Sequence, residues 1–239
     1  MIVAAHQPLF IPWIGYFNKI SRSDLFVIVD NVQFTTSGWI RRNSIKGPGG
    51  LQKLIVPIKG KKSLGQLIRD VLIDNKGNPM WRQKHVKALE LNYRKAAFFP
   101  EVMTSLERIY SEKWDYLAEF NIALMEFVCK YLEIPTPLVK SSDKRIEGGK
   151  TELIVDICEK TGADIFMLGM GGSVAYADAQ FIRSKGFELV TQDFIHPTYT
   201  QLFGDFVPRL SVLDILFNVG PESATIVKRS CGTGDLPRS

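Results

Sequence analysis

Apolar residues along this chain gather in short, unbroken runs that end in polar residues. The clearest run is Asp24–Asp30, with the sequence DLFVIVD. Unbroken runs of this length are typical of strands that are covered on both faces, as in parallel sheets. Further strands are predicted at Ile2–Ala5, Leu54–Ile58, Leu67–Ile73, Pro137–Lys140, Asp164–Leu168 and Phe187–Thr191. The chain is therefore predicted to build a parallel-type sheet.

A second pattern, with apolar residues three or four positions apart, predicts helices between these strands. The predicted helices are Gly15–Ser21, Trp81–Tyr93, 98–111, Trp114–Glu133, Thr151–Lys160, Ala177–Lys185 and Ser211–Asn218. The glycine-rich segment 35–53 is predicted to be a long loop. Alternation of strands and helices indicates a Rossmann-like α/β fold, with a helical insertion at about 79–133. Its opening, a strand, a His-containing loop, a helix and a second strand, also looks related to nucleotidyltransferases.

The composition is that of a folded globular protein, with 45% hydrophobic and 23% charged residues among 239. One α/β domain is predicted at 1–228, followed by a disordered tail at 229–239. No signal peptide is evident, and no stretch approaches the roughly 20 apolar residues of a membrane helix. The three cysteines show no paired spacing. We therefore expect a cytoplasmic protein with no membrane span.

The net charge of +5 favours anionic small-molecule partners such as nucleotides or nucleotide sugars. Lysine and arginine are spread along the chain, so no specific nucleic-acid surface is predicted. The sequence contains no GxSxG, HExxH, CxxC or HxGH motif, and neither a metal site nor a cofactor is identified.

The first candidate site follows the first predicted strand. His6 is a candidate acid or base near neutral pH, and Gln7 offers both a hydrogen-bond donor and an acceptor. Trp13 and Tyr16 are candidates for stacking on a ligand ring, although they would serve equally to build a rigid corner. The N-terminus of the following helix would attract an anion, and Lys19 closes the motif as a further binding candidate.

The second candidate site follows the second strand. Asp30 is a candidate for contacting a substrate hydroxyl, an amine or a metal, with the capping of a turn as its alternative. Arg42 is suited to bidentate binding of phosphate or carboxylate, with an exposed basic loop as its alternative. Asn43 stands beside it as a further binding candidate.

Two later segments complete the candidates. Glycines 169 and 171 follow a predicted strand, where they would let the backbone approach a ligand, and Tyr176 follows them. In the second segment, His196 is expected on the same rim as His6, where both could share acid-base work, with Tyr199 and Gln201 nearby. The third histidine, His85, is predicted to lie on the surface of a helix.

The run from His6 to Lys19 and the segment Ser23–Phe34 closely resemble the WbqC-like family. Further matching segments are Trp39 with Arg42–Ile45, Leu54–Pro57, the Gly169 turn with Tyr176, His196–Gln201 and Phe206–Asn218. The resemblance covers nearly the whole chain and implies a role in the biosynthesis of bacterial surface glycans, including O-antigen. The chain departs from the family at Asn31, where a second acid is frequent. This departure weakens the hypothesis of a metal site made of two carboxylates.

This resemblance favours a transferase that joins an activated acyl or aminoacyl group to the amine of a nucleotide-linked amino sugar. The attacking amine must lose a proton, for which His6 or His196 would be the base. Arg42 would bind a phosphate, Trp13 would stack on a ring, and Gln7 and Asn43 would bind oxygens of the substrates. Two alternatives are a nucleotidylyltransferase-like or adenylate-forming enzyme and a non-catalytic nucleotide-sugar-binding module. We expect His6, Arg42 and His196 to surround a common pocket.

Overall fold

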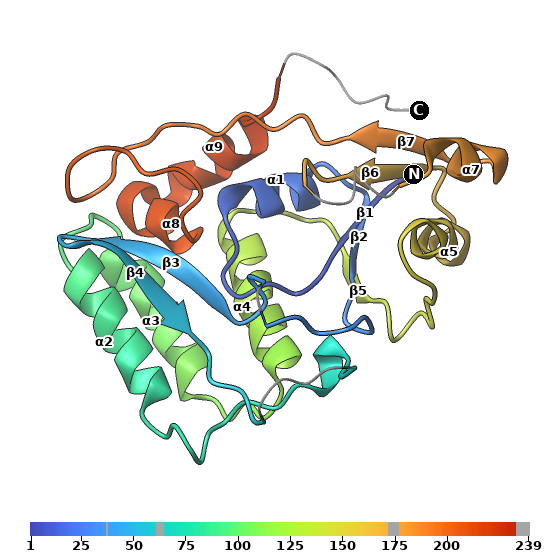
Figure 1. The fold of residues 1–239 in the computed structure, drawn as a ribbon. Coiled ribbons are helices and arrows are strands. Elements are labelled where there is room, and N and C mark those ends of the chain that lie inside the picture. The colour runs from blue at the N-terminus through green and yellow to red at the C-terminus, as the bar shows by residue number, and fades with distance from the viewer. Residues whose placement is uncertain (37, 61–64, 172–176, 233–239) are drawn as a thin grey trace.

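The structure is a computed structural model, and it describes every residue except 37, 61–64, 172–176 and 233–239. Five parallel strands form the main sheet in the order β5-β2-β1-β6-β7. Their bounds are β1 (Ile2–His6), β2 (Leu25–Ile28), β5 (Leu138–Lys140), β6 (Ile165–Leu168) and β7 (Glu188–Thr191). In chain order this sequence of strands is third, second, first, fourth, fifth, as in doubly wound sheets. The predicted Rossmann-like α/β fold is therefore confirmed (Figure 1).

Alternate side chains of β1 enter two different apolar cores. Ile2 and Ala4 belong to the larger core, whereas Val3 belongs to a smaller core on the opposite face. The smaller core is covered by α5 (Thr151–Thr161) and α7 (Ala179–Ser184), which lie together on one side of the sheet (Figure 1). Both faces of the central strands are thus buried, which explains why β2 and β6 are apolar without interruption.

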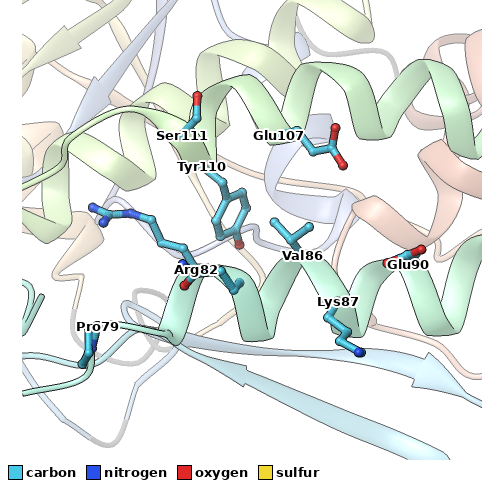
Figure 2. Close-up of a pocket in the computed structure, with 9 residues that line it drawn as sticks. Pro79, Arg82, Val86, Lys87, Glu90, Glu107, Tyr110 and Ser111 are labelled. Carbon is cyan, nitrogen blue, oxygen red and sulfur yellow. The ribbon is translucent and has the colours of Figure 1, made fainter.

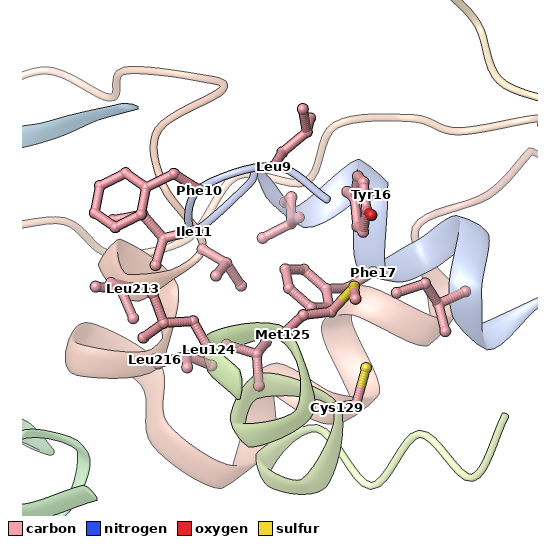
Figure 3. Packing of buried hydrophobic residues seen from close by; sticks show 14 of the residues in the cluster. Leu9, Phe10, Ile11, Tyr16, Phe17, Leu124, Met125, Cys129, Leu213 and Leu216 are labelled. Atoms are coloured by element: carbon pink, nitrogen blue, oxygen red, sulfur yellow. The ribbon is translucent and has the colours of Figure 1, made fainter. Parts of the chain in front are cut away.

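The larger core is covered by helices from distant parts of the sequence. These helices are α1 (Ile14–Ser21), α4 (Leu117–Tyr131), α8 (Leu213–Val219) and α9 (Ser223–Arg229), with the 3-10 turn η2 (Gly220–Glu222) between the last two. Figure 3 shows side chains of the segment before and within α1, such as Phe17, facing Met125 of α4 and Leu213 of α8. The segment that follows β1 is therefore packed against the core along much of its length.

The predicted helical block is present as α2 (Trp81–Tyr93), α3 (Phe99–Ser111) and α4. His85 on α2 is only 5% exposed, so the prediction of a surface histidine is wrong. Its Nδ1 lies 3.2 Å from the Tyr110 hydroxyl, and its Nε2 lies 3.1 Å from both the backbone nitrogen and the carbonyl oxygen of Ile55. The helix lies between α3 and a β-hairpin, and this burial lowers the pKa of His85 to about 4.

The predicted loop at 35–53 is also wrong, because it contains most of an antiparallel hairpin. The hairpin consists of β3 (Arg42–Gly47) and β4 (Gly50–Ile55), which pair in register from Gly47 opposite Gly50. The predicted strand Leu54–Ile58 overlaps only the end of β4, and Leu67–Ile73 contains the 3-10 turn η1 (Ile68–Asp70) instead of a strand. In β3, Asn43 and Lys46 are buried and make hydrogen bonds to segments that are distant in sequence, so the local pattern does not reveal the strand.

The last described helix, α9, ends at Arg229, one residue beyond the predicted end of the domain, and the division into a domain and a tail stays a prediction. Residues 233–239 of the predicted tail lie outside the described part of the chain. None of the described helices combines the length and the apolar character of a membrane span.

Candidate functional site

The strand order changes direction at β1, which lies between β2 and β6. His6 pairs with Ile28 at the end of β2, and Leu168 ends β6 opposite Thr191 of β7. The predicted residues His6, Asp30 and Gly169 therefore stand at or just beyond the carboxyl ends of three neighbouring strands. In open α/β sheets, this is the edge at which ligands bind.

The ring of His6 is held in one tautomer. Its Nδ1 lies 3.1 Å from the Gln7 carbonyl oxygen, which can only accept, so Nδ1 carries the hydrogen. Its Nε2 then bears the lone pair, and no residue in the described chain makes a hydrogen bond to it. The Tyr16 hydroxyl donates to the same carbonyl at 3.0 Å, and its ring makes an edge contact with His6. His6 is thus an oriented imidazole with an open acceptor.

Burial and the positive charge of Lys19 lower the pKa of His6 to about 3. His6 is consequently neutral at pH 7, the form that accepts a proton. Lys19 is itself 4% exposed and donates from Nζ to the Ala5 carbonyl at 2.8 Å. Burial lowers its pKa to about 7. Two nitrogenous side chains of lowered basicity therefore stand at the end of β1.

The segment between β1 and α1 is fixed by two buried asparagines. Asn121 of α4 donates from Nδ2 to the Pro8 carbonyl at 2.9 Å and to the Ile40 carbonyl at 2.7 Å. Asn43 of β3 donates to the carbonyls of Phe10 at 3.2 Å and Ile11 at 2.6 Å. The amide nitrogen of Asn43 is therefore occupied by the protein itself, which gives it a positioning role.

Asn121 was not singled out in the sequence. The available signal was an amide on the apolar face of a helix, four residues after Leu117 and three before Leu124, since a buried amide needs partners. Ile11 adopts a φ of 38°, a conformation that a branched residue rarely adopts. The asparagine bonds thus hold the segment in a shape that it would not adopt alone.

Asp30 is 3% exposed, and two serines beyond β5 surround it. Its Oδ1 accepts from the Ser141 hydroxyl at 2.9 Å and from the Ser142 N–H at 3.0 Å, while Oδ2 accepts from the Ser142 hydroxyl at 2.6 Å. The serines also follow a strand end, a signal that would have identified them from the sequence. Both carboxylate oxygens of Asp30 thus have partners in the protein, and its contact with a substrate stays a prediction.

His196 lies close to the segment after β1 through Trp13. The two rings stack with centroids 6.1 Å apart and planes 13° from parallel. Nδ1 of His196 donates to the Pro197 carbonyl at 2.8 Å, and Nε2 accepts from the Arg209 N–H at 3.0 Å. Burial also lowers the pKa of His196. Because both ring nitrogens are engaged, His196 has less capacity than His6 to take a proton from a substrate.

Tyr199 and Gln201 belong to a hydrogen-bond network behind this segment. The Tyr199 hydroxyl donates to Asp214 Oδ2 at 2.9 Å, and the Gln201 amide donates to the Val207 carbonyl at 2.9 Å. Arg42 opens β3 opposite Ile55, in the hairpin and outside the parallel sheet. The structure thus distributes these three residues over the scaffold around the edge of the sheet.

The glycine turn after β6 is described only in part. Gly169 is half-buried next to Lys19, and Gly171 is exposed. Tyr176 lies outside the described residues. Within the described chain, no cluster of three or more His, Cys, Asp or Glu side chains is arranged to hold a metal ion.

A groove of about 490 Å³ lies elsewhere, between α2 and α3 (Figure 2). Val86 and Tyr110 lie between the two helices, and Arg82, Glu90 and Glu107 stand around them. None of the predicted site residues lines this groove. It is thus separate from the cluster at the strand ends.

Comparison with known proteins connects the chain to one family. The model of the WbqC-like protein family matches residues 7–226. The uncharacterized protein Rv1507c of Mycobacterium tuberculosis (strain ATCC 25618 / H37Rv) is 38% identical over 223 residues, covering 92% of this chain and 95% of that protein. No solved structure matches.

Proposed function

Because this chain belongs to the WbqC-like protein family, we propose that it is a transferase of bacterial surface glycan biosynthesis. The substrate would be a nucleotide-linked amino sugar, whose amine receives an activated acyl or aminoacyl group. The observation that carries this proposal is the oriented neutral His6, with an open Nε2, at the strand edge where ligands bind.

In the proposed reaction, the amine nitrogen attacks the carbonyl carbon of an acyl thioester or acyl phosphate. The new N–C bond forms, a proton passes from the nitrogen to His6 Nε2, and the bond between the carbonyl carbon and the leaving group breaks. His6 then returns the proton to the departing thiolate or phosphate, so that the products are an amide and a neutralised leaving group. The Gln7 carbonyl stabilises the imidazolium through its hydrogen bond to Nδ1–H.

The other predicted residues receive roles that follow from their contacts. The Gln7 side-chain amide, half-buried beside His6, is proposed to bind an oxygen of the sugar or of the acyl group. Tyr16 orients His6 by holding the Gln7 carbonyl. Trp13, backed by His196, is proposed to present its remaining surface to a ring of the nucleotide.

The test is an assay of amide formation. Purified protein is incubated with UDP-linked sugars that carry a free amine and with acyl and aminoacyl thioesters, and products are identified by mass spectrometry. Wild-type protein is expected to form the amide. The His6→Gln variant is expected to lose about a hundredfold or more in turnover, the usual contribution of a general base.

The same substitution at His196 is the comparison. Its effect on turnover should be smaller, because both nitrogens of His196 already have partners in the protein. Full turnover by His6→Gln would remove the base from this proposal. Binding of the UDP-linked sugar without any transfer would instead support a non-catalytic binding module.

A further inference from the structure

Lys19 is a buried ammonium group without a carboxylate partner in the described chain. The ion pairs found there involve other residues, and the Ala5 carbonyl is the one acceptor that Lys19 Nζ contacts. Its Nζ also lies 5.8 Å from the centre of the Phe26 ring. An ammonium group has three N–H donors, and burial of its charge is costly unless an anion or several acceptors surround it. The described residues thus satisfy this side chain only in part.

The position of the ammonium group is informative. Lys19 lies on α1, and its Nζ reaches the carbonyl of Ala5 near the end of β1. Gly169, which follows the end of β6, lies beside it. This is the switch point of the sheet, between β1 and β6, where doubly wound proteins bind ligands. The imidazole of His6 is close enough for the charge of Lys19 to affect its titration.

Gly169 gives a second, independent indication. Its φ does not require glycine, since it lies outside the positive region that other residues avoid. A Cβ atom at this position would instead stand 3.5 Å from Lys19 Nζ, and among the described residues that are not its chain neighbours Lys19 alone has atoms within 4 Å of it. Glycine at this position therefore adds no side-chain atom next to the ammonium group at the end of β6.

We propose that Lys19, with the space left by Gly169, binds a phosphate group of the substrate at the switch point between β1 and β6. This inference rests on the proposed function, and it assigns the nucleotide diphosphate to a particular place in the site. Lysine commonly binds phosphate as a compact point charge. A phosphate here would neutralise the buried ammonium and place the rest of the nucleotide-linked sugar next to His6.

Isothermal titration calorimetry with inorganic pyrophosphate and with UDP tests the inference without requiring turnover. Lys19→Met keeps the length of the side chain and removes its charge, and it is expected to weaken both ligands about ten- to a hundredfold. Gly169→Ala is expected to weaken them severalfold, because its methyl group would cover Nζ. Gly149→Ala is the matched control, since nothing lies within 4 Å of a Cβ there.

The melting temperature of each variant shows whether it is folded, and Gly169→Ala tests the site even if Lys19→Met unfolds. Wild-type affinity in both variants would overturn the inference. Arg42→Ala is titrated as well, and a loss of affinity confined to that variant would also overturn it. A titration with glycine distinguishes a carboxylate from a phosphate: Lys19-dependent binding of glycine, without pyrophosphate, would overturn the assignment. Lys19-dependent pyrophosphate binding by a protein that transfers no acyl group would leave this inference standing and remove only the transferase.

Discussion

At the residue scale, Lys19 and His6 share one electrostatic problem. Both would be cations beside each other in a buried place, and burial is the main cause of the lowered pKa of each. The Ala5 carbonyl accepts a hydrogen bond from Lys19, and the Gln7 carbonyl accepts one from His6. A bound anion would relieve both, so ligand binding should raise the pKa of His6 and make it a stronger base during catalysis.

The pH dependence of stability provides a prediction for Lys19. Its pKa is lowered from 10.5 to about 7, so the unfolded chain holds the proton more tightly and stability rises as the pH increases from about 7 to 10.5. Below pH 7 the full cost of the buried charge is present. Lys19→Met should therefore raise the melting temperature at pH 6, by about 2–4 °C for each kcal/mol recovered.

This advantage should shrink at pH 9.5, where wild-type Lys19 is neutral in the folded protein. The neighbouring titratable group is His6, which stays neutral at both pH values and leaves the comparison undisturbed. Thermal unfolding at the two pH values gives the answer. A Met variant that is less stable than wild type at both would indicate that the hydrogen bond to Ala5 outweighs the cost of burying the charge.

At the scale of elements, the segment between β1 and α1 is held at nearly every backbone carbonyl. Besides the asparagine contacts, the Pro12 carbonyl accepts from the Val212 N–H at 2.9 Å, and the Phe10 N–H donates to the Trp39 carbonyl at 3.1 Å. The partners come from β3, from α4 and from the segment before α8. The segment that follows His6 is therefore positioned by elements outside the parallel sheet.

Asn121→Ala tests this positioning. It leaves the buried carbonyls of Pro8 and Ile40 without their donor, which should cost about 1–3 kcal/mol in the free energy of unfolding. Turnover should fall with a largely unchanged KM, since His6 would be less well oriented. Asn78→Ala, which removes an exposed hydrogen bond to Asp74, is the control and should have little effect on either quantity in denaturant titrations. An equally small effect of Asn121→Ala would show that this segment is rigid without it.

The elements also show what the sequence can and cannot predict. The central strands β1, β2 and β6 were predictable because each is apolar over almost its whole length, whereas β7 has a polar residue at each end. The hairpin was not, because Asn43 and Lys46 are buried through partners at Ile11 and Asp205 that are remote in sequence. His85 had a usable signal, since Trp81, His85 and Leu89 lie four residues apart on one face of α2 and are all buried.

At the scale of the whole molecule, Asp214 joins three regions. Its carboxylate accepts from Tyr93 of α2 at 2.8 Å and from Tyr199, beyond β7, at 2.9 Å, while Asp214 itself lies on α8. Burial raises the pKa of this carboxyl group. The Tyr93 hydroxyl also accepts from the Lys46 N–H of β3 at 3.1 Å. The network thus links the helical block, the hairpin and the C-terminal segment.

Tyr199→Phe is expected to lower the free energy of unfolding by about 1–3 kcal/mol, because it removes a donor from a buried carboxylate. The double variant with Tyr93→Phe should cost more than the sum of the single changes, since Asp214 would lose both hydroxyl donors. Tyr116→Phe, at an exposed position, serves as the control. Urea titrations measure all four variants, and strict additivity would argue against a coupled network.

The arrangement of the candidate site follows only in part from local sequence patterns, because it also depends on the order of the strands in the whole molecule. Placing His6 and Gly169 at one edge followed from their positions after predicted parallel strands. Local patterns do not give the strand order that puts β6 beside β1. The contact between Lys19 and Gly169 depends on that order, so it could not be predicted either. Whether His6, Arg42 and His196 share one pocket stays a prediction, because Arg42 belongs to the hairpin and His196 to an irregular segment.

The anchoring of the segment after β1 has a consequence for biosynthesis of the protein. His6 is synthesised before the groups that fix its surroundings, which follow at positions 43, 121 and 212. The Asn18 side chain of α1 donates to the Val227 carbonyl at 2.9 Å, and this acceptor is synthesised later still. A nascent chain therefore carries His6 in a segment that lacks these hydrogen bonds until residues 212 and 227 have been synthesised.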